Sequence, residues 1–235
     1  FVLSPTADLN PNSSLTRYLS LALTEFGTKG SKSFFTEKGL ETESLIETLR
    51  NSEKKGEPVL LIGATFAYVH LLDYLREKNF HFSLADSSRI FDTGGFKGQS
   101  REVEMDALYQ DFNHFFGVPR SLCVNMYGMT ELCSQMYDQT IRSHYLSEVI
   151  GTDKKGPAWI RTVVLDTNTL KPVERGQVGV LAHYDLANWN ACMAILTEDL
   201  GYETDKGFVL LGRVEGSEAK GCSIAVDQLL QATKL

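Results

Sequence analysis

One short segment of the sequence combines the residue types that a phosphate- and magnesium-binding site needs. It reads Tyr127-Gly128-Met129-Thr130-Glu131 and follows a short apolar run. Gly128 allows a turn, the Thr130 hydroxyl can donate to an anionic oxygen, and Glu131 offers the hard oxygen ligand that Mg²⁺ prefers. Because Thr and Glu are also favoured in the first turn of a helix, an ordinary helix start is the alternative interpretation.

Two other glycine-containing loops occupy equivalent places along the chain. Gly63-Ala64-Thr65 and Gly94-Gly95 each follow a predicted strand, as Gly128 does. In an open parallel sheet the loops at the carboxyl ends of the strands lie at one edge, where glycine lets a ligand approach the backbone. Three such loops predict a site for a small molecule at this edge.

Strands and helices alternate in the part of the chain that carries these loops. A helix begins at Ser13-Ser14, and further helices are predicted over 66–78 and 101–116. Short apolar runs predict strands over 58–62, 81–84, 89–91 and 121–126. This order predicts an α/β fold in which helices flank a parallel sheet.

The pattern changes after about residue 150. Alternating and β-branched segments over 159–165, 180–184 and 208–211 are separated by turn residues, which predicts antiparallel strands. We therefore expect an α/β subdomain over residues 1–150, a smaller β-rich subdomain over 151–211, and a C-terminal segment over 212–235.

Charge and cysteine content exclude several classes of protein. The 235 residues carry 23 Lys and Arg against 30 Asp and Glu, a net charge of −7, which argues against nucleic acid or an anionic membrane as the main partner. The most apolar stretch, 58–72, is too short for a membrane span. The four cysteines form no C-x-x-C pair, so we expect reduced thiols in a cytoplasmic protein. Cys123, Cys133 and Cys192 are expected in the core.

Three motifs in a fixed order resemble those of the adenylate-forming superfamily, which includes acyl-CoA synthetases, luciferases and peptide-synthetase adenylation domains. The segment at 127–131 resembles its Y-G-x-T-E motif, Thr-Glu-Asp-Leu-Gly-Tyr at 197–202 its T-G-D-x-G segment, and Leu-Gly-Arg at 211–213 its L-G-R hinge. The resemblance implies that Asp199 and Arg213 hold the ribose of ATP. It places Gly94 and Gly95 near the adenine and the acyl group.

The resemblance also implies roles for the residues of the first motif. Tyr127, Gly128 and Thr130 would belong to the ATP site, with Thr130 contacting a phosphate. Glu131 would hold Mg²⁺, so that Thr130 and Glu131 would both serve the chemical step.

Further segments resemble one branch of this superfamily, the LuxE-type acyl-protein synthetases. They are Leu-Ser-Pro at 3–5 with Asn-Ser-Ser-Leu at 12–15, the run at 125–131, and Gly-Ser-Glu-Ala-Lys-Gly-Cys-Ser at 216–223. Enzymes of this type activate a fatty acid with ATP, move the acyl group to a cysteine of their own and pass it to an acyl-protein reductase. The resemblance therefore implies that Cys222 is the acyl acceptor.

Two features of the superfamily have no counterpart in this sequence. The Ser/Thr/Gly-rich phosphate loop, expected upstream of the matched region, is not found, and neither is the C-terminal domain with its catalytic lysine. We therefore expect the chain as given to lack adenylating activity. Two alternative functions stay open: an acyl-CoA ligase of the phenylacetate type, and a non-catalytic subunit that binds an acyl group or a nucleotide.

Overall fold

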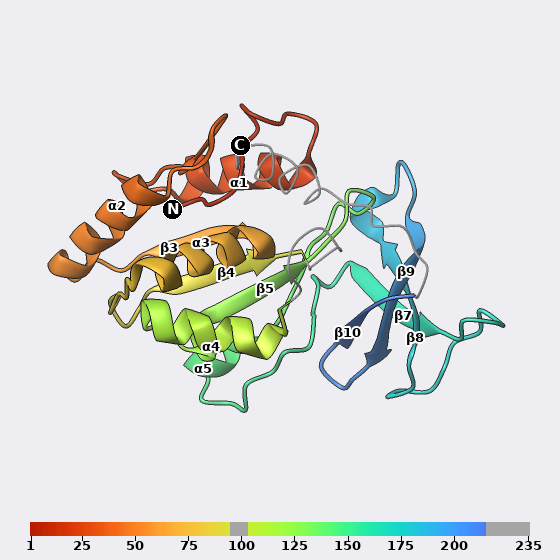
Figure 1. The fold of residues 1–235 in the computed structure, drawn as a ribbon. Helices are drawn as coiled ribbons and strands as arrows, with labels where there is room; N and C mark the ends of the chain where they lie inside the picture. Colours follow the sequence, from red (N-terminus) through yellow and green to blue (C-terminus); the bar gives the residue numbers. More distant parts are fainter. Residues whose placement is uncertain (95–102, 215–235) are drawn as a thin grey trace. The chain divides into compact units, whose positions relative to one another are not determined.

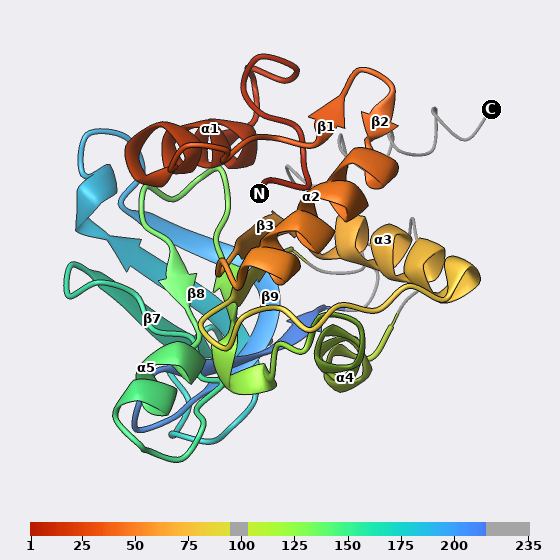
Figure 2. The same ribbon diagram turned by 90° about the vertical axis from the view of Figure 1, so that its left-hand side faces the viewer.

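The computed structural model describes residues 1–94 and 103–214. The chain divides into two compact units after Val124, and we describe each unit separately (Figures 1 and 2). The boundary that composition suggested, at residue 150, lies inside the second unit. None of the helices in the described part of the chain has both the length and the apolar character needed to cross a membrane.

The first unit combines helices with a parallel pair of strands. Its elements are α1 (Ser14–Phe26), β1 (Phe35–Thr36), β2 (Gly39–Leu40), α2 (Thr42–Lys55), β3 (Leu60–Ala64), α3 (Thr65–Lys78), β4 (Arg89–Thr93), α4 (Met105–Phe116), η1 (Arg120–Leu122) and the start of β5 (Cys123–Tyr127). β3 and β4 are parallel, with Leu60 opposite Arg89 and Ala64 opposite Thr93. The predicted parallel α/β arrangement is confirmed.

Buried aromatic side chains hold the helices of the first unit against its strands. The rings of Tyr68 in α3 and Phe112 in α4 lie 4.9 Å apart in an edge-to-face arrangement, and the two helices lie side by side (Figure 2). The Tyr68 hydroxyl donates to the carbonyl oxygen of Phe91 in β4 at 2.8 Å. Burying such large rings stabilises the packing of these helices, and the polar tip of Tyr68 still has its hydrogen bond.

Two parts of the first unit differ from the sequence prediction. The segment 81–84 is not a strand, because the backbone N–H groups of Phe82 and Leu84 donate to the carbonyl oxygens of Phe115 and Phe116. These bonds satisfy carbonyl groups that the end of α4 leaves without helical partners. Helix α2 was not predicted, although Leu45 and Leu49 are buried on one of its faces and a left-handed Gly56 ends it.

The second unit is mainly an antiparallel sheet. It contains the end of β5, β6 (Met136–Tyr137), α5 (Thr140–Tyr145), β7 (Ile160–Leu165), β8 (Gly179–Asp185), η2 (Leu186–Asn188), β9 (Ala194–Glu203) and β10 (Phe208–Arg213). Strands β10, β9, β8 and β7 neighbour one another in that order, and all their pairings are antiparallel (Figure 1). The predicted antiparallel, β-rich second part is confirmed.

Strand β5 belongs to both units and ends at the first residue of the Y-G-M-T-E segment. It is the third strand in the order β3-β4-β5-β6, and β6 pairs with it antiparallel through Met126 and Tyr127. Tyr127 therefore enters the core of the second unit, where it is buried with Leu132, Met136, Val164, Leu181 and Phe208.

Candidate functional site

Tyr127 and Asp199, which the sequence analysis took from two separate motifs, are hydrogen-bonded. The Tyr127 hydroxyl donates to Oδ2 of Asp199 at 2.6 Å, and its ring packs edge-on against Phe208. Burial raises the pKa of Tyr127 above its ordinary value, and the charge of Asp199 raises it further. The hydroxyl consequently keeps its proton and acts as a fixed donor to the carboxylate.

A β-bulge brings the third motif to the same place. The register between β10 and β9 shifts between Leu210 and Gly212, so that Arg213 lies opposite Asp199. Gly212 has a φ of 135°, which side chains with a Cβ rarely adopt. Arg213 Nε lies 3.5 Å from Asp199 Oδ1, and its Nη2 donates to Oε2 of Glu198 at 2.6 Å. The bulge therefore sets the arginine beside the carboxylate.

The backbone of Asp199 is also held in place. Its N–H donates to Thr197 Oγ1 at 3.0 Å, and the Thr197 hydroxyl donates to the carbonyl oxygen of Leu181 in β8 at 2.8 Å. The Thr-x-Asp spacing thus anchors the aspartate to the neighbouring strand. Of the two Asp199 oxygens, Oδ2 accepts the hydrogen bond from Tyr127, and Oδ1 lies beside Nε of Arg213.

The segment after Gly128 forms a turn, so the alternative interpretation of Thr130 and Glu131 as a helix start is wrong. The buried carboxylate of Asp185 accepts hydrogen bonds from the backbone N–H groups of Cys133 and Ser134 at 3.0 and 2.8 Å. Asn188 donates to the carbonyl oxygen of Glu131 at 2.7 Å. Residues of β8 and η2 therefore hold this loop in a non-helical shape.

The side chains of Thr130 and Glu131 are exposed at this turn. Within the described ranges, no three His, Cys, Asp or Glu side chains are grouped so that they could hold a metal ion. Mg²⁺ at nucleotide sites usually has one or two carboxylate ligands and takes its other ligands from phosphates and water. A single exposed Glu131 fits a site of that kind, which is completed by a bound nucleotide.

A histidine that belongs to none of the three motifs joins this cluster. His183 in β8 is fully buried, with Nε2 3.2 Å from the Tyr127 hydroxyl and Nδ1 2.9 Å from Thr162 Oγ1 in β7. Burial lowers the pKa of His183 from 6.5 to about 4, and the negative charge of Asp185 only partly opposes this. His183 is therefore neutral near pH 7.

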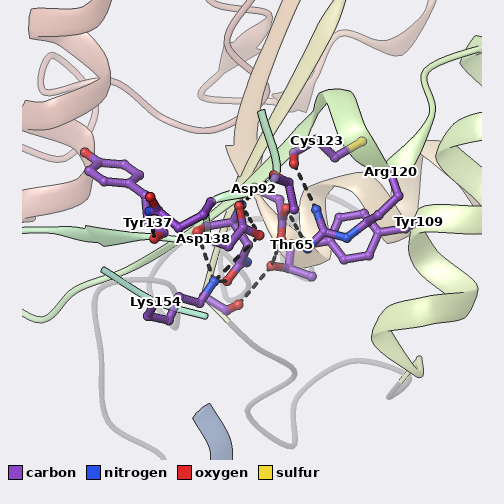
Figure 3. A network of polar contacts seen from close by, with 12 residues as sticks. Thr65, Asp92, Tyr109, Arg120, Cys123, Tyr137, Asp138 and Lys154 are labelled. Atoms are coloured by element: carbon purple, nitrogen blue, oxygen red, sulfur yellow. Dashed lines mark hydrogen bonds and ion pairs between the residues drawn. The ribbon is translucent and has the colours of Figure 1, made fainter. Parts of the chain in front are cut away.

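Gly94 lies in the first unit, at the end of β4. It has a φ of 83°, and its carbonyl oxygen lies 3.0 Å from the Thr65 hydroxyl. Asp92, which sequence reasoning did not single out, is fully buried beside it and accepts from the Tyr109 hydroxyl at 3.0 Å (Figure 3). Thr65 Oγ1 also lies 3.3 Å from Asp92 Oδ2, so the first residue of α3 holds Asp92 and Gly94 in place at the end of β4.

A buried lysine in the second unit holds Asn125, the first residue of β5 that belongs to this unit. Lys154 Nζ donates to the carbonyl oxygen of Asn125 at 3.0 Å and lies 3.9 Å from Asp138 Oδ2 (Figure 3). Asp138 also accepts from the Asn125 backbone N–H at 3.1 Å. Removing either charge would leave the other buried and unpaired, so we assign this pair a structural role.

The cysteines only partly follow the prediction. Cys123 is buried as expected, but Cys133 and Cys192 are exposed, so the expectation of a core position is wrong for these two. Cys133 lies in the loop whose backbone N–H groups donate to the carboxylate of Asp185. Cys222, like Gly95, lies outside the described residues.

Curated proteins of known name are similar to most of this chain. A long-chain-fatty-acid–luciferin-component ligase of Aliivibrio fischeri is 26% identical over 205 residues, which are 82% of this chain and 51% of that protein. The ligase of the same name from Vibrio harveyi is 22% identical over 206 residues, or 84% of this chain and 52% of that protein. The chain thus spans about half the length of these relatives.

Solved structures show the same fold. The ATP-bound MatB of Rhodopseudomonas palustris matches 90% of this chain and 39% of its own with a TM-score of 0.57 at 16% identity. An ATP-bound chimera of RpMatB and BxBclM matches the same shares with a TM-score of 0.59 at 14% identity. Both matches cover most of this chain, so the predicted fold class is confirmed.

A comparison with protein families covers the part of the chain that holds the three motifs. The model of the family described as "Acyl-protein synthetase, LuxE" matches residues 14–231, which include the Tyr127 segment, Asp199 and Arg213. Since this match covers most of the sequence, the chain belongs to the LuxE acyl-protein synthetase family.

Proposed function

We propose that this chain is the part of an ATP-dependent acyl-protein synthetase that holds the nucleotide and accepts the acyl group. The observation that carries the proposal is the convergence of Tyr127, Asp199 and Arg213 in one unit, with Asp199 Oδ1 beside the guanidinium. A carboxylate and a guanidinium placed in this way can accept from and donate to the hydroxyl oxygens of a ribose.

The first half-reaction would join a carboxylic acid to the nucleotide. A carboxylate oxygen of the acid attacks the α-phosphorus of ATP, and pyrophosphate leaves with the electron pair of the broken bond. Thr130 would donate to a phosphate oxygen, and Glu131 would hold a Mg²⁺ ion, whose charge would offset the negative charge that develops at phosphorus. Asp199 and Arg213 keep the ribose fixed during this step, so the α-phosphate stays in line with the acid.

The second half-reaction would move the acyl group to the protein. The Cys222 thiolate attacks the acyl carbonyl and AMP leaves, which gives a thioester that is still reactive enough to pass on. The relatives' names support a long-chain fatty acid as the substrate. An acyl-protein reductase would then take the acyl group. The free, exposed thiols of Cys133 and Cys192 are consistent with a reducing, cytoplasmic compartment.

The test measures acylation of the full-length gene product that contains this chain. The protein is incubated with ATP, Mg²⁺ and a long-chain fatty acid, and its intact mass is recorded before and after treatment with hydroxylamine. We expect one hydroxylamine-labile acyl adduct on the wild type and none on Cys222→Ser. Cys133→Ser and Cys192→Ser are matched controls, since both remove an exposed thiol, and both should keep the adduct.

Other outcomes would favour the alternatives. Pyrophosphate release without an adduct, together with formation of acyl-CoA when coenzyme A is added, would favour an acyl-CoA ligase. Binding of nucleotide or fatty acid with neither adduct nor pyrophosphate would favour a non-catalytic binding subunit.

A further inference from the structure

Four side chains from four strands form one continuous hydrogen-bonded chain in the second unit. Thr162 in β7 contacts His183 in β8, His183 contacts Tyr127 at the end of β5, and Tyr127 contacts Asp199 in β9. The three contacts measure 2.9, 3.2 and 2.6 Å. Only Tyr127 and Asp199 belong to recognised motifs. The hydrogen bonds therefore link these two residues to His183 and Thr162, which have no assigned role.

The direction of every hydrogen bond in this chain follows from the number of protons available. An ionised Asp199 can only accept, so the single hydroxyl proton of Tyr127 points to Asp199. The Tyr127 oxygen must then accept from His183, which requires the proton on Nε2. Since a neutral imidazole carries one proton, Nδ1 is an acceptor, and the Thr162 hydroxyl donates to it.

With the hydrogen bonds in this direction, His183 is the residue that holds the Tyr127 hydroxyl in place. Without the donor at Nε2, the Tyr127 oxygen loses the hydrogen bond that sets the direction of its O–H, and the hydrogen bond to Asp199 Oδ2 weakens. The carboxylate would then be free to turn, and Oδ1 would leave its place beside Arg213. A hydrogen bond to a charged acceptor is among the stronger ones, so its loss changes the orientation of the carboxylate appreciably.

We propose that His183, in the Nε2-protonated form and supported by Thr162, is a positioning residue that orients Asp199 through Tyr127 for binding the ribose hydroxyls of ATP. The identity of the ligand rests on the proposed function, whereas the tautomer and the direction of the chain rest on the geometry alone. His183 is buried behind Tyr127 and acts on the nucleotide only through it.

Two substitutions at one position separate positioning from packing. In His183→Gln the side-chain amide nitrogen can take the place of Nε2 and donate to Tyr127. In His183→Asn the shorter amide reaches only the Nδ1 side, facing Thr162. In the full-length gene product we expect His183→Asn to raise the KM for ATP about three- to tenfold in ATP–pyrophosphate exchange. The KM for the fatty acid should stay unchanged, and His183→Gln should recover most of the effect.

A role in packing alone predicts a different result. Both variants would then lower the thermal unfolding temperature, and the KM values for ATP and for the fatty acid would move together or not at all. Equal KM values for ATP in the Asn and Gln variants, with both proteins folded, would overturn the proposal.

A measurement on the wild type keeps the proposal testable if both variants fail to fold. Long-range ¹H–¹⁵N spectra of the histidine-labelled protein report which ring nitrogen carries the proton. We expect protonated Nε2 and unprotonated Nδ1 for His183 at pH 7. The opposite tautomer would overturn the proposal even if ATP is a substrate. The expected tautomer in a protein that shows no ATP–pyrophosphate exchange would overturn the proposed function and the ribose as the ligand. The direction of the hydrogen bonds from Thr162 to Asp199 would still stand.

Discussion

The Tyr127 hydroxyl lies 2.6 Å from Oδ2 of Asp199, although 72 residues separate the two in the sequence. The last residue of one strand thus donates a hydrogen bond to a residue in the middle of another. The contact ties the Y-G-M-T-E segment to the Thr-x-Asp segment within one compact unit. It makes Tyr127 a donor to the carboxylate, whereas its ring is largely covered by Phe208 and the other core residues.

Removing this donor should weaken nucleotide binding more than folding. Tyr127→Phe keeps the ring in its apolar surroundings but leaves Asp199 Oδ2 without its hydrogen bond. We expect the KM for ATP to rise several-fold, and the free energy of unfolding to fall by about 1 kcal/mol. Pyrophosphate exchange and urea unfolding measure the two effects. A large loss of stability with an unchanged KM would contradict the proposed role of Tyr127.

Neutralising the carboxylate should have a larger effect. Asp199→Asn replaces an acceptor-only group beside Arg213 by a neutral amide, so we expect the rate of pyrophosphate exchange at low ATP to fall by about tenfold or more. Glu203→Gln is the matched control: Glu203 lies on the same strand and contacts Arg175 across an exposed 3.7 Å pair. Its effect should stay within about twofold, since exposed ion pairs contribute little. Similar losses in both variants would point to a general effect of charge.

Sequence patterns predicted the parts of the site that lie within single segments. The end of β5 at Tyr127, and Asp199 and Arg213 in their short motifs, could be found because a few adjacent residues define each of them. The interpretation of Thr130 and Glu131 as a helix start was wrong because the group that holds this loop in another shape is distant in the sequence. Asp185 follows Cys133 by 52 residues in the sequence, yet its carboxylate takes the loop's backbone N–H groups.

His183 could not be found for the same reason. Its partners Thr162 and Tyr127 lie 21 and 56 residues away, and the sequence around it shows only an apolar strand. Asp92 was missed in the same way, since the hydroxyls that hold it come from Thr65 and Tyr109. Buried polar residues of this kind are identified by their partners, and register and packing bring those partners together.

Gly212 should be required for the position of Arg213. Gly212→Ala meets no steric obstacle at Cβ, but its φ of 135° is a conformation that alanine strongly disfavours. We expect a loss of about 1–3 kcal/mol in the free energy of unfolding, and a raised KM for ATP as the bulge relaxes. Gly128→Ala is the control, because a Cβ there would lie 3.6 Å from Gln135 at an ordinary contact distance. It should cost clearly less stability in urea unfolding; equal losses would show that the bulge is not strained.

The buried imidazole predicts a specific dependence of stability on pH. The pKa of His183 is lowered from 6.5 to about 4 by burial, so between these values the unfolded chain binds a proton that the folded protein does not. Stability therefore rises with pH in this window and is lost as the pH falls from about 6.5 towards 4. For this one group the full loss is roughly 3 kcal/mol. Urea unfolding at several pH values measures the slope.

Carboxylates also titrate near the lower end of this window, so the comparison with His183→Gln isolates the histidine. The variant keeps a donor towards Tyr127 but has no titrating ring, and Asp185 and Asp199 stay in place around it. We expect the wild type to lose more stability than His183→Gln between pH 6.5 and 4.5. Only the wild type has an imidazole at this position, and it binds a proton more readily in the unfolded chain than in the folded protein. Parallel curves for the two proteins would mean that His183 titrates near its ordinary pKa. In that case it would carry two protons at mildly acidic pH, and Nδ1 could no longer accept from Thr162.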